Sequence, residues 1–542
     1  MGNVDYIVAG GGSAGCALAA RLSEDPRNRV ALLEAGGTSD DLMVKLPVGI
    51  MKLMPDPERN WMYVTEPDET LLGRRLVWHA GRMLGGGSSI NGMVYIRGAT
   101  YDYDGWAAAG CTGWGWGDVL PFFRKSEDFD GPASQWHGKS GPLGVSRQRV
   151  QHPIVPAFLA ACEEAGLRQV EDYCSGDIDG AFVNLATMRG GLRCSAAEGF
   201  LKPARKRSNL SVITGATVDR VLIEQGRAVG VRYLKDGQSH DLRTAGEVIV
   251  SASTMQSPAI LMRSGIGPGA QLREHGIEVL CASAEVGRNL HEHPSMSSSR
   301  LINLPSYGAG MGLFDYARHG LDFLLRRRGL LSTCTVHAMA HARSSPDKEH
   351  PDIKLQLMPL WNDPAVRSEF KHDIPMPDSA KSPGVQVTIN VMDMRSRGEI
   401  RLRSADPVAK PVIDIRMYDD PRDLVAMREA IRFTNRIFEA PAMARHVTGT
   451  AYPADPHMSD AALEDQIRKY TQIGYHPVGT CRMGADQNAV VDPRLRVRGV
   501  EGLRVADASI MPTMPSANTN APSIMIGEKC AAMVLEDARR RV

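Results

Sequence analysis

Residues 4–15 read Val-Asp-Tyr-Ile-Val-Ala-Gly-Gly-Gly-Ser-Ala-Gly. The apolar run Val4–Ala9 predicts a buried strand, and Gly10, Gly12 and Gly15 follow it in the spacing G-x-G-x-x-G. In this spacing the first glycine permits a tight turn and the second lets the backbone approach a pyrophosphate. The third lets helix and strand pack closely. The run therefore predicts the phosphate-binding turn of a dinucleotide fold.

The residues after this turn complete the unit. A helix of small residues extends through Leu22, and a second strand, Arg29–Leu33, ends on Glu34. Glu34 lies about 20 positions beyond the last glycine, where a carboxylate can bind a ribose hydroxyl. The helix N-terminus would face the phosphates with free N–H groups. We expect an adenine dinucleotide here, contacted by Gly10, Gly12, Ser13, Ala14, Gly15, Glu34 and Ala35.

Composition bounds the class of protein. A chain of 542 residues is too long for one compact core, so we expect at least two domains. Its net charge of +1 gives no electrostatic reason to expect nucleic acid or a membrane surface as partner. Nine cysteines without a C-x-x-C pair favour a reducing compartment over a disulfide framework or a zinc site, and no metal is expected. The first strand leaves no room for a signal peptide, and no apolar run reaches the ~18 residues of a membrane span, so we expect a cytoplasmic protein.

The rest of the chain alternates strand and helix patterns. One face of the strand at 385–392 carries Gln386, Thr388 and Asn390, which would either face solvent or line a pocket. The elements predicted by their periods are strands within 209–250 and at 352–358 and 385–392, and helices at 313–328, 421–439 and 459–470, with a proline-rich loop at 362–384.

Two further loops place the chain in a family. Residues 81–98 read Gly-Arg-Met-Leu-Gly-Gly-Gly-Ser-Ser-Ile-Asn-Gly-Met-Val-Tyr-Ile-Arg-Gly, and residues 253–267 read Ser-Thr-Met-Gln-Ser-Pro-Ala-Ile-Leu-Met-Arg-Ser-Gly-Ile-Gly. Both resemble the signature segments of the glucose–methanol–choline (GMC) oxidoreductases. The resemblance covers essentially the whole chain and includes Asn60-Trp61. A glycine-rich backbone with free N–H groups and two serine hydroxyls suits contact with a flat ring and its diphosphate.

The resemblance implies FAD as the cofactor and an α/β fold of two domains. A Rossmann-like FAD-binding domain would comprise residues 1–155, 195–300 and 471–542. A substrate domain built on an antiparallel sheet flanked by helices would comprise residues 156–194 and 301–470. The further cofactor contacts that it implies are Arg82, Gly85, Gly86, Ser89, Asn91, Gly92, Met93, Val218, Asp507, Ala508, Asn520, Ala521 and Pro522.

Ile90 departs from the pattern of family members whose flavin is covalently bound. Those members carry a histidine at this position of the loop. Isoleucine has no nucleophilic atom, so we expect the FAD to be held noncovalently.

The chemistry is expected near the C-terminus. By the resemblance, His476 is the active-site base and Asn518 is its partner. Oxidation of an alcohol by flavin needs a hydride moved from carbon and a proton removed from the hydroxyl. Histidine, with an ordinary pKa of about 6.5, can accept that proton, and asparagine can hydrogen-bond the same hydroxyl without competing for it. A helix is expected to begin after Asn520, with Pro522 in its first turn and its positive end at the flavin.

These features predict oxidation of a primary alcohol to the aldehyde, with dioxygen or another acceptor reoxidising the flavin. Trp361, Met358 and Tyr475 are the expected pocket residues. Trp361, Met358 and the near-neutral net charge together favour an uncharged alcohol, aromatic or allylic. Gly474 would leave space for dioxygen. Two other classes stay open, because fold does not fix reaction. One is a lyase or light-driven fatty-acid decarboxylase, and the other is a flavoprotein that uses FAD only for structure.

Overall fold

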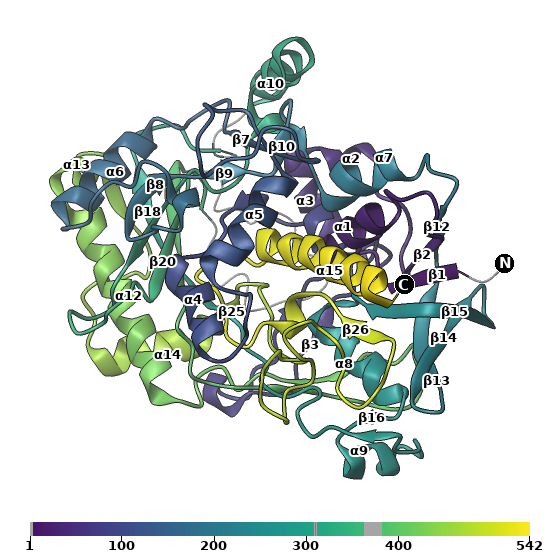
Figure 1. Ribbon diagram of the computed structural model, residues 1–542. Helices are drawn as coiled ribbons and strands as arrows, with labels where there is room; N and C mark the ends of the chain where they lie inside the picture. The colour runs from purple at the N-terminus through teal and green to yellow at the C-terminus, as the bar shows by residue number, and fades with distance from the viewer. Residues whose placement is uncertain (1–3, 308, 310–311, 362–381, 542) are drawn as a thin grey trace.

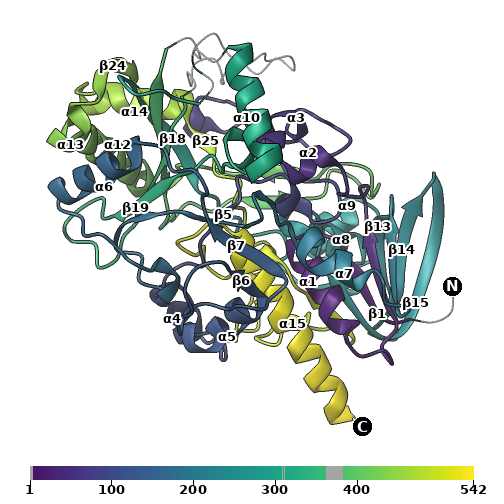
Figure 2. The same ribbon diagram turned by 90° about the horizontal axis from the view of Figure 1, so that it is seen from above.

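The fold is taken from a computed structural model, which describes residues 4–307, 309, 312–361 and 382–541. Two seven-stranded sheets organise it. Figure 1 shows the first sheet on the right, the second on the left, and helix α15 (Asn520–Arg541) in the centre, packed against α1 (Ser13–Leu22). Seen from above, the two sheets lie at opposite ends of the molecule (Figure 2). The α/β fold class predicted from the sequence is confirmed.

The first sheet contains the predicted dinucleotide strands. Its strands run in the order β12-β2-β1-β15-β14-β13, with β26 beside β15. The members from β12 to β26 pair in parallel, and β13 and β14 form an antiparallel ribbon with the first half of β15. These three strands lie in the region 209–250, where strands were predicted, and β15 is a single strand of 13 residues. The bounds are β1 Val4–Ala9, β2 Val30–Glu34, β12 Leu210–Thr214, β13 Thr217–Glu224, β14 Arg227–Lys235, β15 Gln238–Val250 and β26 Leu503–Val505.

The second sheet is antiparallel throughout. Its order is β24-β18-β21-β20-β19-β8, with β25 beside β18. Helix α12 (Pro421–Glu439) packs on β21, β18 and β20. The bounds are β8 Gly180–Val183, β18 Pro294–Ile302, β19 Ala338–Ala342, β20 Ile353–Met358, β21 Gly384–Val391, β24 Val447–Tyr452 and β25 Gln472–Ile473.

The polar face of β21 has neither of the two environments expected for it. Gln386 and Asn390 are each 1% exposed, so they do not face solvent, and neither lines the cavity described below. Asn390 is satisfied inside the sheet, where its Oδ1 accepts from Gln356 Nε2 at 2.8 Å. Most of the proline-rich loop predicted at 362–384 lies outside the described residues.

The predicted helices are present, and their first turns explain where they begin. Asp420 accepts a hydrogen bond from the Arg422 N–H, with Pro421 as the first helical residue of α12. Helix α10 (Leu313–Arg326) projects from the body at the top of Figure 1. The other helices are α2 Leu42–Lys45, α3 Ile50–Leu53, α4 Thr100–Ala108, α5 Trp116–Ser126, α6 Ile154–Glu164, α7 Lys202–Ala204, α8 Ser253–Arg263, α9 Gly269–Glu274, α13 Pro441–Ala444 and α14 Asp460–Tyr470.

The two sheets can be compared with the predicted division into domains. The first sheet draws all its strands from the segments assigned to FAD binding. The predicted boundary at residue 300 falls inside β18, and β25 joins the second sheet although it follows residue 471. The domain limits therefore remain a prediction. No helix within the described ranges is long and apolar enough to cross a membrane.

Candidate active site

The turn after β1 requires its glycines for reasons of space. Gly10 has φ +115°, and a Cβ there would lie 2.3 Å from the carbonyl oxygen of Ser251. A Cβ at Gly15 would lie 2.0 Å from the carbonyl oxygen of Gly10, so a larger residue would push α1 away from β1. A Cβ at Gly12 would meet no atom within 4 Å, because this glycine faces an open cavity.

That cavity, of ≈ 380 Å³, lies at the carboxyl ends of the parallel strands. Its wall includes Ala9 and Glu34, the last residues of β1 and β2, Ser251, which directly follows β15, and Asp507, two residues beyond β26. Ligands of open α/β sheets bind at this edge. The residues predicted from the sequence that line the cavity are Gly10, Gly12, Ser13, Ala14, Glu34, Ala35, Gly86, Asn91, Gly92, Met93, Val218, Tyr475, His476, Asp507, Ala508, Asn518 and Asn520.

Some predicted contacts lie one layer behind this wall. The N–H of Gly85 donates to the carbonyl of Gly11 at 2.7 Å and so ties the second glycine loop to the first. Ser89 Oγ donates to the carbonyl of Leu84 at 2.8 Å, inside its own loop. The Arg82 guanidinium lies 5.0 Å from the ring centre of Trp61. The predicted residues outside the lining are Gly15, Arg82, Gly85, Ser89, Ala521 and Pro522, together with two pocket residues considered next.

Neither Met358 nor Trp361 lines this cavity, so their place in a substrate pocket remains a prediction. Met358 ends β20 and packs against the apolar core. Trp361 lies against the backbone of Gly384, where a Cβ would be 2.2 Å from the indole ring, and its Nε1 donates to the carbonyl of Ser382 at 3.0 Å. Both side chains are therefore used in packing.

Other residues line the cavity without having been assigned to it from the sequence. Trp61 and the start of α8, Ser253–Gln256, stood inside segments that carried the family resemblance, so a signal for them existed. Trp78 and His79, on and after the short strand β4 (Val77–Trp78), and Ile50 on α3 gave no such signal. Burial lowers the pKa of His79 to about 4, so this side chain is a neutral imidazole.

Glu34 holds the first glycine loop as well as facing the cavity. Its Oε2 accepts from the N–H of Gly11 at 2.9 Å, and its Oε1 accepts from the N–H of Gly36 at 2.8 Å. Burial raises the pKa of this carboxyl, and the two backbone donors oppose that shift. The carboxylate keeps free lone pairs for a hydroxyl group in the cavity.

Two helices begin at the cavity and are joined there. Ser13 Oγ, in the first turn of α1, donates to Oδ1 of Asn520, the first residue of α15, at 2.8 Å. The Nδ2 of Asn520 is buried and has no hydrogen-bond partner among the described residues. A buried donor of this kind requires a partner. Together with two helix N-termini and the open space at Gly12, it fits an anionic dinucleotide such as FAD.

The predicted catalytic pair is in direct contact. His476 Nε2 lies 2.8 Å from Nδ2 of Asn518, and both residues line the cavity. Burial lowers the pKa of His476 well below its ordinary value, and the positive charge of Lys354 adds to that shift. The imidazole is therefore neutral at neutral pH, and a neutral imidazole can accept a proton.

Glu292 and His293 support His476 from behind. The carboxylate of Glu292 accepts the backbone N–H groups of His476, at 2.9 and 2.8 Å, and of His293, at 2.7 Å. The two imidazoles meet through their Nδ1 atoms at 3.1 Å. Burial raises the pKa of Glu292 to about 8. Potential metal-ligand atoms of these three residues lie within 4.8 Å of one another. The hydrogen bonds above engage the carboxylate and both Nδ1 atoms, whereas Nε2 of His293 is buried without a hydrogen-bond partner among the described residues.

Gly474 lines the cavity and lies against the base, and its expected role as space for dioxygen remains a prediction. A Cβ at this position would lie 2.9 Å from Nδ1 of His476 and 3.0 Å from the carbonyl oxygen of His293. The space beside this glycine is thus occupied by the base itself. A larger residue would displace His476.

A dinucleotide turn at the edge of a parallel sheet, with a buried neutral histidine on the same cavity, defines the class of protein as a dinucleotide-dependent oxidoreductase. Comparison with known proteins specifies it further. Residues 4–295 and residues 394–527 match the two models described as GMC oxidoreductase. The chain belongs to the GMC oxidoreductase family, and it is an FAD-dependent oxidoreductase.

Individual relatives agree over nearly the full length. The oxygen-dependent choline dehydrogenase of Rhizobium etli is 39% identical over 534 residues, which cover 98% of this chain and 95% of the relative. The structure of pyridoxine 4-oxidase from Mesorbium loti aligns with a TM-score of 0.87 at 30% identity, covering 98% and 99% of the two chains. Formate oxidase of Aspergillus oryzae RIB40 aligns with a TM-score of 0.90 at 25% identity, covering 100% and 99%.

Proposed function

We propose that this enzyme oxidises a primary alcohol to the aldehyde, with Nε2 of His476 taking the proton of the substrate hydroxyl. The observation that carries the proposal is the contact of 2.8 Å between this nitrogen and Asn518 Nδ2 on the cavity wall. The asparagine amide can donate to the substrate oxygen and hold it beside the base. Because burial keeps the imidazole neutral, the base is ready at neutral pH.

The same proposal assigns the cofactor contacts. When bound, FAD supplies the acceptor for the substrate's hydride. Gly12, Ser13 and Asn520 would receive its diphosphate at the two helix N-termini, and Glu34 its ribose. Ile90 lines the cavity and offers no atom for a bond to the ring, which supports noncovalent binding.

The substrate that the cavity suits best is an uncharged alcohol, aromatic or allylic. Among the described lining residues the only carboxylates are Glu34 and Asp507, and both are engaged by backbone N–H groups of loops. A quaternary ammonium such as choline, named for the relatives, would find no free anion beside the base. Trp61 and Trp78 line the cavity and offer aromatic surface on which an aromatic alcohol can stack. Pyridoxine, which the structural relative oxidises by its name, is an aromatic alcohol.

The proposed setting is the cytoplasm, with dioxygen or another acceptor reoxidising the flavin. All nine cysteines are free thiols, and eight of them are buried. Free thiols in this number suit a reducing compartment.

An anaerobic panel of alcohols followed by air tests the function. Bleaching of the flavin by a benzylic or allylic alcohol is the expected result, and the rate of recolouring in air separates oxidase from dehydrogenase. A lyase on the same fold would instead cleave a cyanohydrin, and a light-driven decarboxylase would convert a fatty acid under illumination. In both cases the flavin would stay oxidised with every alcohol of the panel. A flavin that nothing in the panel reduces or uses would favour a structural role.

A further inference from the structure

Helix α10 carries an apolar face that no described residue covers. Phe314, Leu324 and Leu325 are 80%, 72% and 73% exposed, the three highest values among the large apolar side chains that the structure describes. Leu321 is 57% exposed. At 3.6 residues per turn, positions 314, 321 and 325 lie on one side of the helix, with 324 beside them. An apolar stripe therefore runs along the outward side of α10.

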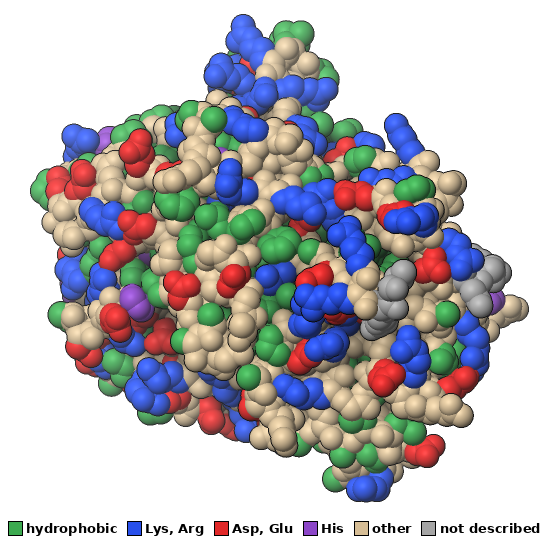
Figure 3. Space-filling view, in the orientation of Figure 1, with side chains coloured by type: hydrophobic (Ala, Val, Ile, Leu, Met, Phe, Trp, Pro, Cys, Tyr) green, Lys and Arg blue, Asp and Glu red, His purple; other side chains and the backbone are tan. Residues whose placement is uncertain are grey.

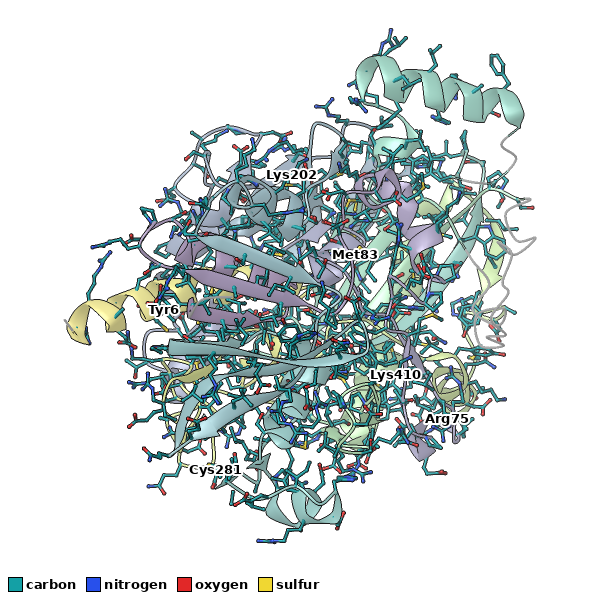
Figure 4. The ribbon with its side chains drawn as sticks, turned by 90° about the vertical axis from the view of Figure 1, so that its right-hand side faces the viewer. Tyr6, Arg75, Met83, Lys202, Cys281 and Lys410 are labelled. Carbon is teal, nitrogen blue, oxygen red and sulfur yellow. The ribbon has the colours of Figure 1, made fainter. Side chains whose placement is uncertain are left out.

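The opposite side of the helix attaches it to the protein. Phe323 is 6% exposed, and the guanidinium of Arg327 lies 4.8 Å from its ring centre. The carboxylate of Asp315 accepts the N–H of Gly312 at 3.1 Å and fixes the first turn. Figures 1 and 4 show α10 standing clear of the body. The stripe thus points away from the protein as part of an ordered helix.

Four arginines accompany this stripe, three of them at the C-terminal end of the helix. Arg318, Arg326, Arg327 and Arg328 are all exposed, against two aspartates in residues 313–328. This one segment therefore carries an excess of two positive charges, more than the +1 of the whole chain. Figure 3 shows hydrophobic side chains together with Lys or Arg at the outer end of the projection, and further Lys and Arg side chains lower on it. An apolar ridge in a basic collar is typical of helices that lie in a membrane interface.

We propose that α10 docks the enzyme on the surface of an anionic lipid bilayer. The apolar stripe would enter the headgroup region, and the arginines would contact the lipid phosphates. A second copy of the chain is the less suitable occupant. It would bring the same excess of two positive charges on this segment, whereas an anionic bilayer offers charge of the opposite sign. An exposed apolar patch of this kind marks an interaction site. A bilayer with anionic headgroups offers an apolar interior for the stripe and negative charge for the arginines.

The position of α10 gives the docking a consequence for the active site. The turn Leu330–Ser332 after α10 contacts the turn Pro47–Gly49, which leads directly into α3. Ile50 of α3 lines the cavity, and its neighbour Met51 is 53% exposed. Docking through α10 would therefore bring this wall of the cavity towards the bilayer. An alcohol or an electron acceptor dissolved in the membrane would then be close at hand, whichever alcohol is the substrate.

Vesicle sedimentation of the FAD-loaded full-length enzyme tests the proposal. We expect binding to vesicles of equimolar phosphatidylcholine and phosphatidylglycerol, weaker binding to pure phosphatidylcholine, and release at high salt. The double variant Leu321→Asp, Leu325→Asp should partition onto the vesicles at least about 10-fold less, because it removes two leucine side chains that would be buried in the bilayer. Val408→Asp, at a side chain that is 67% exposed elsewhere, is the matched control and should bind as the wild type does.

Flavin absorbance, far-ultraviolet circular dichroism and activity on a water-soluble alcohol show that the variants are folded. The proposal is overturned if the wild type stays in the supernatant with both vesicles, or if the double variant binds as well as Val408→Asp. A dimer in light scattering that the double variant dissociates, without any lipid binding, would assign the stripe to a second copy instead.

Discussion

Nζ of Lys354 lies 3.3 Å from Oδ1 of Asn518. The lysine is fully buried in β20, and burial lowers its pKa to about 7, an effect that the neighbouring carboxylate of Glu292 opposes. A lysine at this distance from an amide oxygen acts as a donor. It thereby turns the amide so that Nδ2 faces His476, which leaves Nε2 of the imidazole as an acceptor.

Replacing this lysine should therefore change the protonation of the base. In Lys354→Met the loss of a nearby positive charge raises the pKa of His476, since that charge disfavours the imidazolium. The part of the pH profile over which flavin reduction becomes faster should therefore move to higher pH. The rate at neutral pH should also fall by about 10-fold, because Asn518 loses the hydrogen bond from Lys354 that orients its amide. Rapid-mixing absorbance at several pH values measures both. Lys348→Met, which removes a partly exposed lysine paired with Asp352, is the control. An unmoved limb in Lys354→Met would reduce the lysine to a packing role.

The base itself has a larger expected effect. His476→Ala should retain FAD and fold but slow flavin reduction by about 10²–10⁴-fold, the scale of losing a general base. Because the pKa of His476 lies below its ordinary value, the wild-type rate should rise with pH below about 6.5 and then level off. That limb should be absent in the variant. Asn518→Ala should cost less, since the base remains. Near wild-type reduction by His476→Ala would place the base on another residue.

The cofactor should leave the protein on denaturation. Ile90 lines the cavity and occupies the position at which family members with a covalently bound flavin carry a histidine. Its side chain has no nucleophilic atom. Acid precipitation of the purified yellow protein should release free FAD into the supernatant, identified by chromatography and absorbance. Colour that stays in the pellet would show a covalent bond through some other residue.

Glu34→Ala should lower flavin occupancy much more than it alters the chemistry of the loaded fraction. The carboxylate faces the cavity and also holds the N–H groups of Gly11 and Gly36. Glu34→Gln separates these roles, because an amide oxygen can accept only one of the two backbone bonds while its bulk is kept. Occupancy should fall in the order wild type, Gln, Ala. Normal occupancy in the alanine variant would remove Glu34 from the site.

Gly474→Ala should slow flavin reduction while leaving reoxidation by dioxygen less affected. The added Cβ would press on Nδ1 of His476, 2.9 Å away, and on the backbone of His293. The reductive and oxidative half-reactions can be measured separately by rapid mixing. If instead only the reaction with dioxygen slowed, the glycine would serve oxygen access, as first expected from the sequence.

The sequence alone determined the dinucleotide turn, because its requirements are local. A Cβ at Gly15 would strike the carbonyl oxygen of Gly10, which stands in the same turn, and Gly10 has φ +115°, a backbone conformation that favours glycine. Ile90 and the pair His476 and Asn518 were also found in the sequence, since each stands in a segment that resembles a family motif. The cavity wall then includes most of the predicted cofactor residues.

Only the tertiary structure decided what surrounds those residues. Period-two alternation shows that Lys354 and Asn390 lie on polar faces of their strands, but not what packs against those faces. Lys354 meets Asn518 across 164 positions of sequence, and His293 meets His476 across 183. Residue type alone also could not show that Met358, at the end of β20, and Trp361, three positions later, lie outside the lining of this cavity. Local chemistry identifies the turn and the base, whereas their pKa values depend on burial and on charges that folding brings from distant strands.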